Sequence, residues 1–309
     1  MKKIFPAAII TILILLFLLP NFIFSQNLKR FKKRVAVFEF EDKTDHRVRW
    51  WSGQSVGKGM ADMLVTELVK SGKYKVIERD ALDKIIQEQK LGMTGMVTPQ
   101  SAAKVGQLLG VQVAIVGSVT EFGHSKGATG GRIKNVRIGV SKQSATVGID
   151  VRFIDVNSGE ILAAENIRKE KSKKGLSFGT PKFSFKDRNK FDQSLVGKAT
   201  REAIEAVIKL LDDKTASMPW QAKIIKVAGN NVYINSGAEA GVQNGDVFVV
   251  YAKGEDLIDP DTGLSLGSVD TKIGKIKVVN NNVGGQGKAS LCTIIEGAGF
   301  DRGNFVRTK

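Results

Sequence analysis

Gly53, Ser55 and Gly57 form the pattern G-x-S-x-G, which in hydrolases places a nucleophilic serine on a tight turn. That turn requires a strand immediately before the serine, a helix immediately after it, and a histidine later in the chain. A helix is predicted after Gly57, but the preceding predicted strand ends near Phe40, and His124 is the one histidine that follows. We therefore predict no catalytic residue here and rank a hydrolase third among the functional alternatives.

Other patterns fail the test of spacing for cofactor or metal chemistry. Gly57-Lys58-Gly59 resembles the end of a phosphate-binding loop but lacks the hydroxyl residue that must follow the lysine. The segment Asp259–Gly263 lacks the third acid and the glutamate of a calcium loop, and is more typical of a hairpin turn. One cysteine, Cys292, and two histidines leave too few ligands for a zinc cluster or a disulfide framework. We predict no metal site and no cofactor.

The loop Glu41–Gly57 is the predicted binding segment, because it holds two neighbouring indoles among polar residues. Exposed indole rings are costly in water, so Trp50 and Trp51 either pack against the chain's own core or contact a partner. Loops that are held at both ends by rigid elements are where binding residues tend to lie. The candidate residues of this loop are Arg49, Trp50, Trp51, Gln54 and Ser55.

Alternating strand and helix patterns surround that loop and predict an α/β domain, a mixed sheet with flanking helices. Strand patterns occur at Arg34–Phe40 and Tyr74–Ile77, and Val113–Val119 is a near-continuous apolar strand of the kind buried on both faces. Apolar residues at helical spacing and capping residues predict helices at Met60–Lys70, Ala81–Gln89, Gln100–Leu109 and Leu195–Leu211.

Alternation of apolar and polar residues after Gly123 predicts a long β-hairpin that extends from this domain. The predicted hairpin turn is Ser141–Ala145, and a second turn at Asn157–Gly159 leads into a short strand, Glu160–Ala164. The apolar face of the hairpin meets either lipid or the domain's own helices. The membrane-hairpin candidates are Val136, Ile138, Val140, Val147, Ile149, Val151 and Phe153.

A second domain is predicted after the boundary Ser217–Pro219, where short strands alternate with turn signals. Its predicted strands are Ala222–Val227, Asn231–Ile234, Val247–Tyr251, Gly274–Val279 and Gly287–Ile294. With 42% hydrophobic and 25% charged residues the chain can bury such cores, which excludes bulk disorder. The predicted fold class is therefore α/β with a long β-hairpin extension, residues 26–216, followed by a small all-β barrel, residues 217–309.

The first 25 residues have the layout of a secretory signal peptide: Lys2 and Lys3, an apolar run from Ile4 to Phe24, and small Ser25 at the junction. A retained N-terminal anchor is the alternative. Most of the formal net charge of +16 lies between Gln26 and Ser217, notably at residues 29–34 and 168–190. In an exported protein such segments meet anionic lipid, anionic polysaccharide or acidic partners, or form a solvated face.

Four stretches resemble the curli secretion channel (CsgG) family. They are RVAVFEFEDKT at 34–44, GKGMADMLVTELVKSGKYKVIERDALDKIIQEQKL at 57–91, GVQVAIVGSVTEFG at 110–123 and DVNSGEIL at 155–162. The resemblance implies a non-enzymatic envelope protein that forms a homo-oligomeric, nonameric ring and exports unfolded proteins without nucleotide hydrolysis. It also implies that each subunit adds two β-hairpins to a shared transmembrane barrel, and that the loop holding Trp50 and Trp51 corresponds to the constriction of the channel.

The sequence departs from that family pattern in three places, so a second hypothesis stays open. No cysteine follows the leader for lipidation, and residues 165–190 lack the alternation of a second membrane hairpin. The C-terminal domain is an addition, and its residues 237–251 are similar to the C-terminal β-domain of flagellar assembly protein T.

From this resemblance we expect secreted or envelope protein partners, outer-membrane contact and no nucleic-acid partner. The expected location is the periplasm or the periplasmic face of the outer membrane. The alternative function is a soluble periplasmic oligomeric scaffold or adaptor without a complete pore.

Overall fold

The structure is a computed structural model that describes residues 30–44, 55–77, 110–133, 136–176, 188–258, 260 and 265–308. The chain forms two compact units. Among the described residues, an α/β unit is formed by those within 34–218 and 255–269, and a β-barrel unit by those within 30–33, 219–254 and 270–308. Among the described residues that precede Arg34, residues 30–33 group with the barrel. The predicted helices Ala81–Gln89 and Gln100–Leu109 lie outside the described residues.

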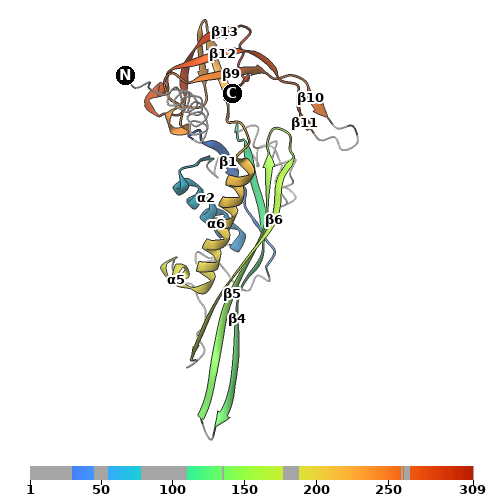
Figure 1. Cartoon of the computed structure of the whole chain (residues 1–309), viewed down its shortest axis with the longest axis vertical. Coiled ribbons are helices and arrows are strands. Elements are labelled where there is room, and N and C mark those ends of the chain that lie inside the picture. Colours follow the sequence, from blue (N-terminus) through green and yellow to red (C-terminus); the bar gives the residue numbers. More distant parts are fainter. Residues whose placement is uncertain are drawn as a thin grey trace, which may run out of the picture. The chain divides into compact units, whose positions relative to one another are not determined.

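A mixed sheet forms the α/β unit, with strand order β3-β1-β4-β5-β6 and β2 beside β4 (Figure 1). β1 and β2 run parallel to β4, whereas β5 pairs antiparallel with both β4 and β6. The strands are β1 (Lys33–Val37), β2 (Glu41–Asp42), β3 (Tyr74–Val76), β4 (Val113–Ile133), β5 (Val136–Asp155) and β6 (Ile161–Leu176). The predicted fully buried strand is confirmed, because Val113 to Val116 are all at most 2% exposed.

Helices α2 (Val56–Ser71) and α6 (Leu195–Thr215) pack their apolar faces on the sheet, and a short helix, α5 (Arg188–Gln193), precedes α6. Each long helix begins after a serine, Ser55 or Ser194, whose hydroxyl accepts a hydrogen bond from a first-turn N–H. The buried helix residues include Met60, Leu64, Leu68, Ala203, Ile204 and Val207. Both helices were predicted, although α2 begins at Val56 rather than Met60 because Ser55 caps it.

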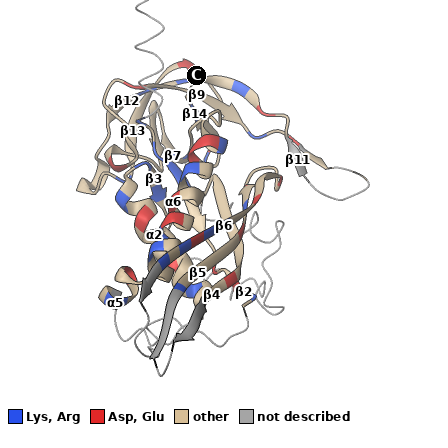
Figure 2. Cartoon of the chain, turned by 60° about the horizontal axis from the view of Figure 1, so that its bottom comes forward, with Lys and Arg blue, Asp and Glu red and all other residues tan. Residues whose placement is uncertain are grey.

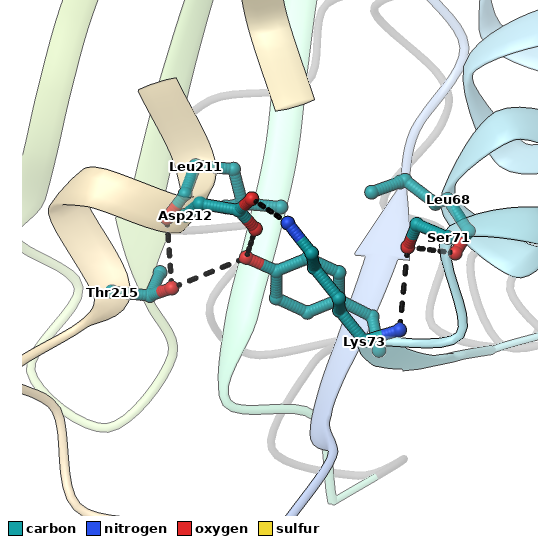
Figure 3. A network of polar contacts seen from close by, with 7 residues as sticks. Leu68, Ser71, Lys73, Leu211, Asp212 and Thr215 are labelled. Carbon is teal, nitrogen blue, oxygen red and sulfur yellow. Dashed lines mark hydrogen bonds and ion pairs between the residues drawn. The ribbon is translucent and has the colours of Figure 1, made fainter. Parts of the chain in front are cut away.

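A polar cluster ties β3 to the C-terminal end of α6 (Figure 3). The Asp212 carboxylate accepts a hydrogen bond from the Tyr74 hydroxyl at 2.6 Å and pairs with the Lys73 ammonium at 2.5 Å. The Thr215 hydroxyl lies 3.4 Å from the Tyr74 hydroxyl. Burial, with the hydrogen bond to Asp212, raises the pKa of Tyr74, so the phenol stays protonated and continues to donate to the carboxylate.

β5 corrects the predicted position of the hairpin turn. The segment Ser141–Ala145 lies inside β5, and the chain reverses between Ile133 and Val136, which are opposite one another. The sequence suggested a turn because apolar residues change from even positions at 136–140 to odd positions at 147–153. The strand instead runs through both sets without a turn. The first set therefore occupies even-numbered positions and the second set odd-numbered positions of the same strand.

The odd-numbered set of membrane-hairpin candidates lies in the α/β core. Val147, Ile149, Val151 and Phe153 are at most 1% exposed and belong to the same apolar cluster as the buried faces of α2 and α6. The sequence left two environments open for these four residues, lipid or the domain's own helices. In the structure they pack against the helices. The side chains of the even-numbered set, Val136, Ile138 and Val140, lie outside the described residues.

β6 extends well beyond the predicted strand Glu160–Ala164. It pairs with β5 from Ile161, opposite Ile154, to Leu176, opposite Val140. The lysine-rich sequence gave no strand pattern, because alternation of apolar residues is absent from it. The strand forms because β5 supplies backbone partners, while side chains such as Arg168 and Lys173 remain exposed to water.

Six antiparallel strands close into the predicted barrel, in the order β12-β13-β8-β7-β14-β9. They are β7 (Gln221–Ala228), β8 (Asn231–Ile234), β9 (Val247–Ala252), β12 (Thr271–Asn280), β13 (Ser290–Gly297) and β14 (Phe305–Arg307). Single 3-10 turns occur at Ala238–Ala240 and Val283–Gly285. The sequence missed β14, which is too short to show a pattern. It also missed the separate hairpin of β10 (Asp256–Ile258) and β11 (Ser265–Ser268), which flanks the turn predicted at residues 259–263.

The single cysteine lies inside this barrel. Cys292 is fully buried and forms no disulfide, and its neighbours in the core include Val232 and Ile276. Burial, reinforced by the negative charge of Asp246, raises the pKa of the Cys292 thiol to about 12. The thiol is therefore both shielded and protonated at neutral pH.

We expect Cys292 to report the opening of the barrel. In the folded protein at pH 8 the thiol should resist an aromatic disulfide reagent, because the reactive species is the exposed thiolate. In denaturant it should react at the rate of an ordinary free thiol. Rapid stoichiometric labelling of the native protein, followed by absorbance, would contradict a closed barrel core.

We also expect a lysine at position 149 to unfold the α/β unit. Ile149 has no exposed surface, so Ile149→Lys should lower the free energy of unfolding by about 4 kcal/mol or more. Ile161 is 47% exposed on β6, and Ile161→Lys, the matched control, should change it by only about 0.5 kcal/mol. Urea unfolding followed by circular dichroism distinguishes them, and equal stabilities for the two variants would rule out the core assignment.

Candidate functional site

The two ends of the predicted binding loop are held together by one carboxylate. Asp42 accepts hydrogen bonds through Oδ1 from the backbone N–H and the hydroxyl of Thr44, at 3.1 and 2.6 Å, and through Oδ2 from the N–H of Val56, at 3.2 Å. The loop interior, with Arg49, Trp50, Trp51 and Gln54, lies outside the described residues. Asp42 therefore fixes where this loop leaves the sheet and where it enters α2.

Ser55 and Gly57 have structural roles at the start of α2. The Ser55 hydroxyl accepts a hydrogen bond from the N–H of Lys58 at 3.1 Å, as a helix cap does. A Cβ atom at Gly57 would lie 1.9 Å from the carbonyl oxygen of Phe40, so only glycine permits this approach of the helix to the strand. The nearest described strand, β2, ends at Asp42. These contacts account for Ser55 and Gly57 of the G-x-S-x-G pattern without a nucleophile, and Gly53 lies outside the described residues.

A β-bulge marks the point where the long hairpin leaves the body of the sheet. Val119 is opposite Ile149 and Glu121 is opposite Gly148, which leaves Thr120 as the extra residue on β4. Gly148 suits this position, because a Cβ atom would lie 2.9 Å from the Thr120 hydroxyl and would require that side chain to shift. The bulge moves the buried positions of β4 from odd to even numbers, so that Phe122 continues the core row begun by Val119.

An open groove of about 400 Å³ lies beside this bulge. Its lining comes from the loop base and from the first residues of the hairpin: Lys43, Thr44, Thr120, Glu121, Phe122, Gly123, His124, Ser125 and Thr146. Hydroxyl and charged groups predominate, and Phe122 is the one large apolar side chain.

The hairpin extension beyond the bulge is strongly basic. Between Glu121 and Asp150 the sequence has no acidic residue, and its basic residues are Lys126, Arg132, Lys134, Arg137 and Lys142. β6 adds Arg168 and four lysines, at 169, 171, 173 and 174, against Glu165 and Glu170. Figure 2 shows the basic residues along β6. At the base of the extension the Arg168 guanidinium meets Glu121 at 3.0 Å, and this hydrogen bond and charge raise the pKa of Arg168.

The remaining membrane-hairpin candidates lie near the tip of the extension. Val136, Ile138 and Val140 are opposite Ile133, Gly131 and Thr129, respectively. Four residues of strand span about 14 Å, whereas the apolar band of an outer-membrane barrel is about 25 Å tall. Lys142, two residues beyond Val140, is opposite Gly127 and Lys174 and ends the apolar stretch. The apolar pattern therefore covers only the distal part of the hairpin.

Neither a metal cluster nor a membrane-spanning helix occurs in the parts of the chain that the structure describes. No group of three or more His, Cys, Asp or Glu side chains there has the arrangement to hold a metal ion. No helix among those residues is long and apolar enough to cross a membrane.

Sequence reasoning missed two parts of this site. Asp42 was not singled out, although a carboxylate two residues before a threonine is a signal for a local side-chain turn. The bulge at Thr120 was missed because the apolar residues on each side of it alternate regularly. Its signal is that the inward-facing positions change from odd numbers up to Val119 to an even number at Phe122. His124, the histidine considered for a triad, is half-buried in β4 and lines the groove.

Comparisons with known proteins give one family and several remote structural likenesses. A family model described as "Curli production assembly/transport component CsgG" matches residues 23–237, more than half of the chain. No curated protein matches the sequence.

Among solved structures, the chain is similar to the hypothetical protein CT253 from Chlamydia trachomatis, with 15% identity, 60% of this chain and 99% of that chain covered, and a TM-score of 0.37. Lipoprotein GNA1162 from Neisseria meningitidis gives 15% identity, 59% and 99% coverage, and a TM-score of 0.33. The PelC dodecamer from Paraburkholderia phytofirmans gives 12% identity, 60% and 90% coverage, and a TM-score of 0.29. At these scores the likenesses carry no argument about function.

We expect removal of the Asp42 carboxylate to loosen the loop without unfolding the sheet. Asp42→Ala should cost about 1–2 kcal/mol, because three N–H and O–H donors lose their acceptor. Amide hydrogen exchange at Val56 and Thr44 should accelerate. Glu41→Ala is the matched control, because Glu41 pairs on the surface with Lys43, at 3.3 Å, and this exposed pair contributes little to stability. Unchanged exchange in Asp42→Ala would show that other contacts hold the loop.

Proposed function

Because this chain belongs to the CsgG family of curli production assembly/transport components, we propose that it is a homo-oligomeric component of a secretion or assembly channel at the bacterial outer membrane. The family makes it an envelope protein of transport or assembly. The proposal adds a ring of identical subunits, a location on the periplasmic face of the outer membrane, and action without nucleotide hydrolysis or other catalysis.

The edge strand β6 carries the proposal of a ring. It is 16 residues long and ends the strand order of the described sheet. A strand of this length at a sheet edge is a template for pairing with another strand. Pairing with a neighbouring copy would satisfy its backbone groups, and the same contact repeated around an axis closes a ring. The lysines of β6 favour a specific partner over indiscriminate aggregation, because they repel other copies of the same edge.

The length of the β4–β5 hairpin supports a conduit. From Glu121, opposite Gly148, to Ile133, opposite Val136, the two strands stay paired over 13 positions. At the rise of a β-strand this is about 40 Å, longer than the hydrocarbon core of a membrane, which is about 30 Å. Copies of this hairpin side by side would form a wall long enough to cross a bilayer.

The loop held by Asp42 supports the position of a constriction. Its first end lies beside the groove at the base of the hairpin, since Lys43 and Thr44 line that groove together with Thr120 and Ser125. In a ring, symmetry would repeat the loop of every subunit around one axis. Trp50, Trp51 and Arg49 would then narrow the conduit and contact an unfolded chain by stacking and cation–π attraction.

A second candidate function is a periplasmic ring that acts as scaffold or adaptor without a complete pore. The short apolar stretch favours it, because only the positions from Val136 to Val140 alternate in the way that lipid contact requires. Lys142 and Lys174, which are opposite one another nearer the body of the sheet, would lie within the bilayer if the hairpin spanned it, where charged side chains are costly.

The oligomeric state of envelope-purified protein, with and without detergent, tests both candidates. We expect electron microscopy and light scattering to show closed rings that require detergent. A matched variant would join Phe122 to Val147 by an Asn-Gly turn, because these residues are opposite one another. It should form rings that stay soluble without detergent. Full-length rings that are soluble without detergent would favour the scaffold, and a monomer at all concentrations would reject both.

We expect the paired indoles to act on passage rather than on folding. Trp50→Ala with Trp51→Ala should leave the melting temperature and the ring unchanged but alter single-channel conductance in a planar bilayer. Trp220→Ala provides the contrast, because Trp220 is 3% exposed in the barrel core and its removal should destabilise that unit by about 3–5 kcal/mol. If the double variant fails to fold, the two indoles are core residues and the constriction is elsewhere.

A further inference from the structure

Arg30 binds to the barrel through a partly buried carboxylate. Its guanidinium pairs with Asp246 and donates a hydrogen bond to the carbonyl of Gly241 at 3.2 Å. The side chains of Arg30 and Asp246 are only 22% and 12% exposed. Asp246 also accepts a hydrogen bond from the N–H of Gln243 at 2.8 Å, which fixes the carboxylate in the turn before β9. The acceptor is therefore positioned by the barrel itself.

Phe31 fills an aromatic pocket next to this ion pair. Its ring lies 5.0 Å from that of Trp220 and 5.7 Å from that of Phe248, and these two rings are 5.0 Å apart. Phe31 is 8% exposed and belongs to the barrel core cluster. The Arg30 guanidinium lies 4.5 Å from the Phe31 ring centre, so cation and ring are recognised as one unit.

The backbone of residues 30–32 passes close to Gly241, where the lack of a side chain leaves room for it. The N–H of Lys32 donates to the carbonyl of Ala240 at 3.0 Å. Gly241 has a φ of +84°, and a Cβ atom there would lie 2.1 Å from the carbonyl oxygen of Arg30. A side chain at position 241 would therefore exclude the segment, whatever its effect on the turn.

This segment is not one of the barrel strands. The barrel closes with six strands that all come after Pro219, and residues 30–32 add no strand to the ladder. They are held by two side chains and a single hydrogen bond between backbone groups. These are the contacts of a bound peptide rather than those of a sheet.

We propose that the barrel carries a peptide-binding site for an arginine followed by an aromatic residue, and that residues 30–32 are its resident, detachable ligand. Asp246 binds the guanidinium, Trp220 and Phe248 contact the aromatic ring, and Gly241 leaves room for the backbone of the segment. While the segment is bound, the chain is held on the barrel directly before β1 begins at Lys33. When it detaches, the site takes an Arg–aromatic segment from another chain.

The test uses the full chain with Arg30→Ala and Phe31→Ala, and a fluorescent synthetic peptide of residues 27–34. Labelling of Cys292 should be about ten- to a hundred-fold faster in the double variant, because a partly buried carboxylate loses its partner. The peptide should bind the double variant with saturation, measured by anisotropy, and restore slow labelling. A peptide carrying the same two alanines should do neither.

Two further variants make the outcome decisive. Lys32→Ala removes an equal charge but keeps the contacts of Arg30 and Phe31 with the barrel. In this variant Cys292 should be labelled as slowly as in the natural chain, and added peptide should not bind. Asp246→Asn in the double variant should weaken peptide binding at least about tenfold, as expected for a lost charge pair. Unchanged labelling in the double variant, failure of the peptide to bind it, or failure of the variant to fold would each overturn the proposal; the last would make the segment an integral part of the core.

Discussion

The pairing of β4 with β5 is the constraint on which the rest of the α/β unit depends. One continuous ladder runs from Val113, opposite Asp155, to Ile133, opposite Val136, and it belongs both to the buried body and to the extension. In the body, the ladder holds the core row that packs on α2 and α6. Just beyond Thr120 the helices still contact the start of the extension, where the Phe122 ring stacks on that of Phe191 and Lys171 of β6 pairs with Glu202 of α6. A single bulge reconciles the two regions by changing the buried positions of β4.

The position of the candidate site follows from close contacts around this ladder. Gly57 lets the start of α2 approach the carbonyl of Phe40, and Gly197 lets α6 approach Phe191, where a Cβ atom would lie 2.0 Å from the carbonyl oxygen. Asp42 then joins the strand end, the loop and the helix start through hydrogen bonds of 2.6 to 3.2 Å. The ends of the loop are thus anchored by elements that the core holds in place, as is usual where a rigid scaffold positions a binding loop.

Sequence patterns predicted the buried elements well and the exposed ones poorly. The strand at Val113, the helix at Leu195 and the barrel after Pro219 carry apolar residues at a regular period, so burial and pattern agree. β6 has no such period, since its partner supplies backbone pairing and its side chains meet water. The hairpin turn was misplaced because the apolar residues of β5 change position along one strand. The contacts of Arg30 with Asp246 join positions 216 residues apart, which no local pattern reveals.

In the proposed ring, neighbouring copies complete the sheet at β6. Amide hydrogen exchange measured separately on the assembled and the dissociated protein tests it most directly, because exchange reports backbone pairing residue by residue. Successive strand amides point to opposite edges, so those of β6 that face away from β5 have no partner strand among the described residues. If β6 pairs with a neighbouring copy, these amides should exchange slowly in the assembly and rapidly after dissociation. The amides paired with β5 should exchange slowly in both forms. Equally rapid exchange of the outer amides in both forms would contradict that pairing.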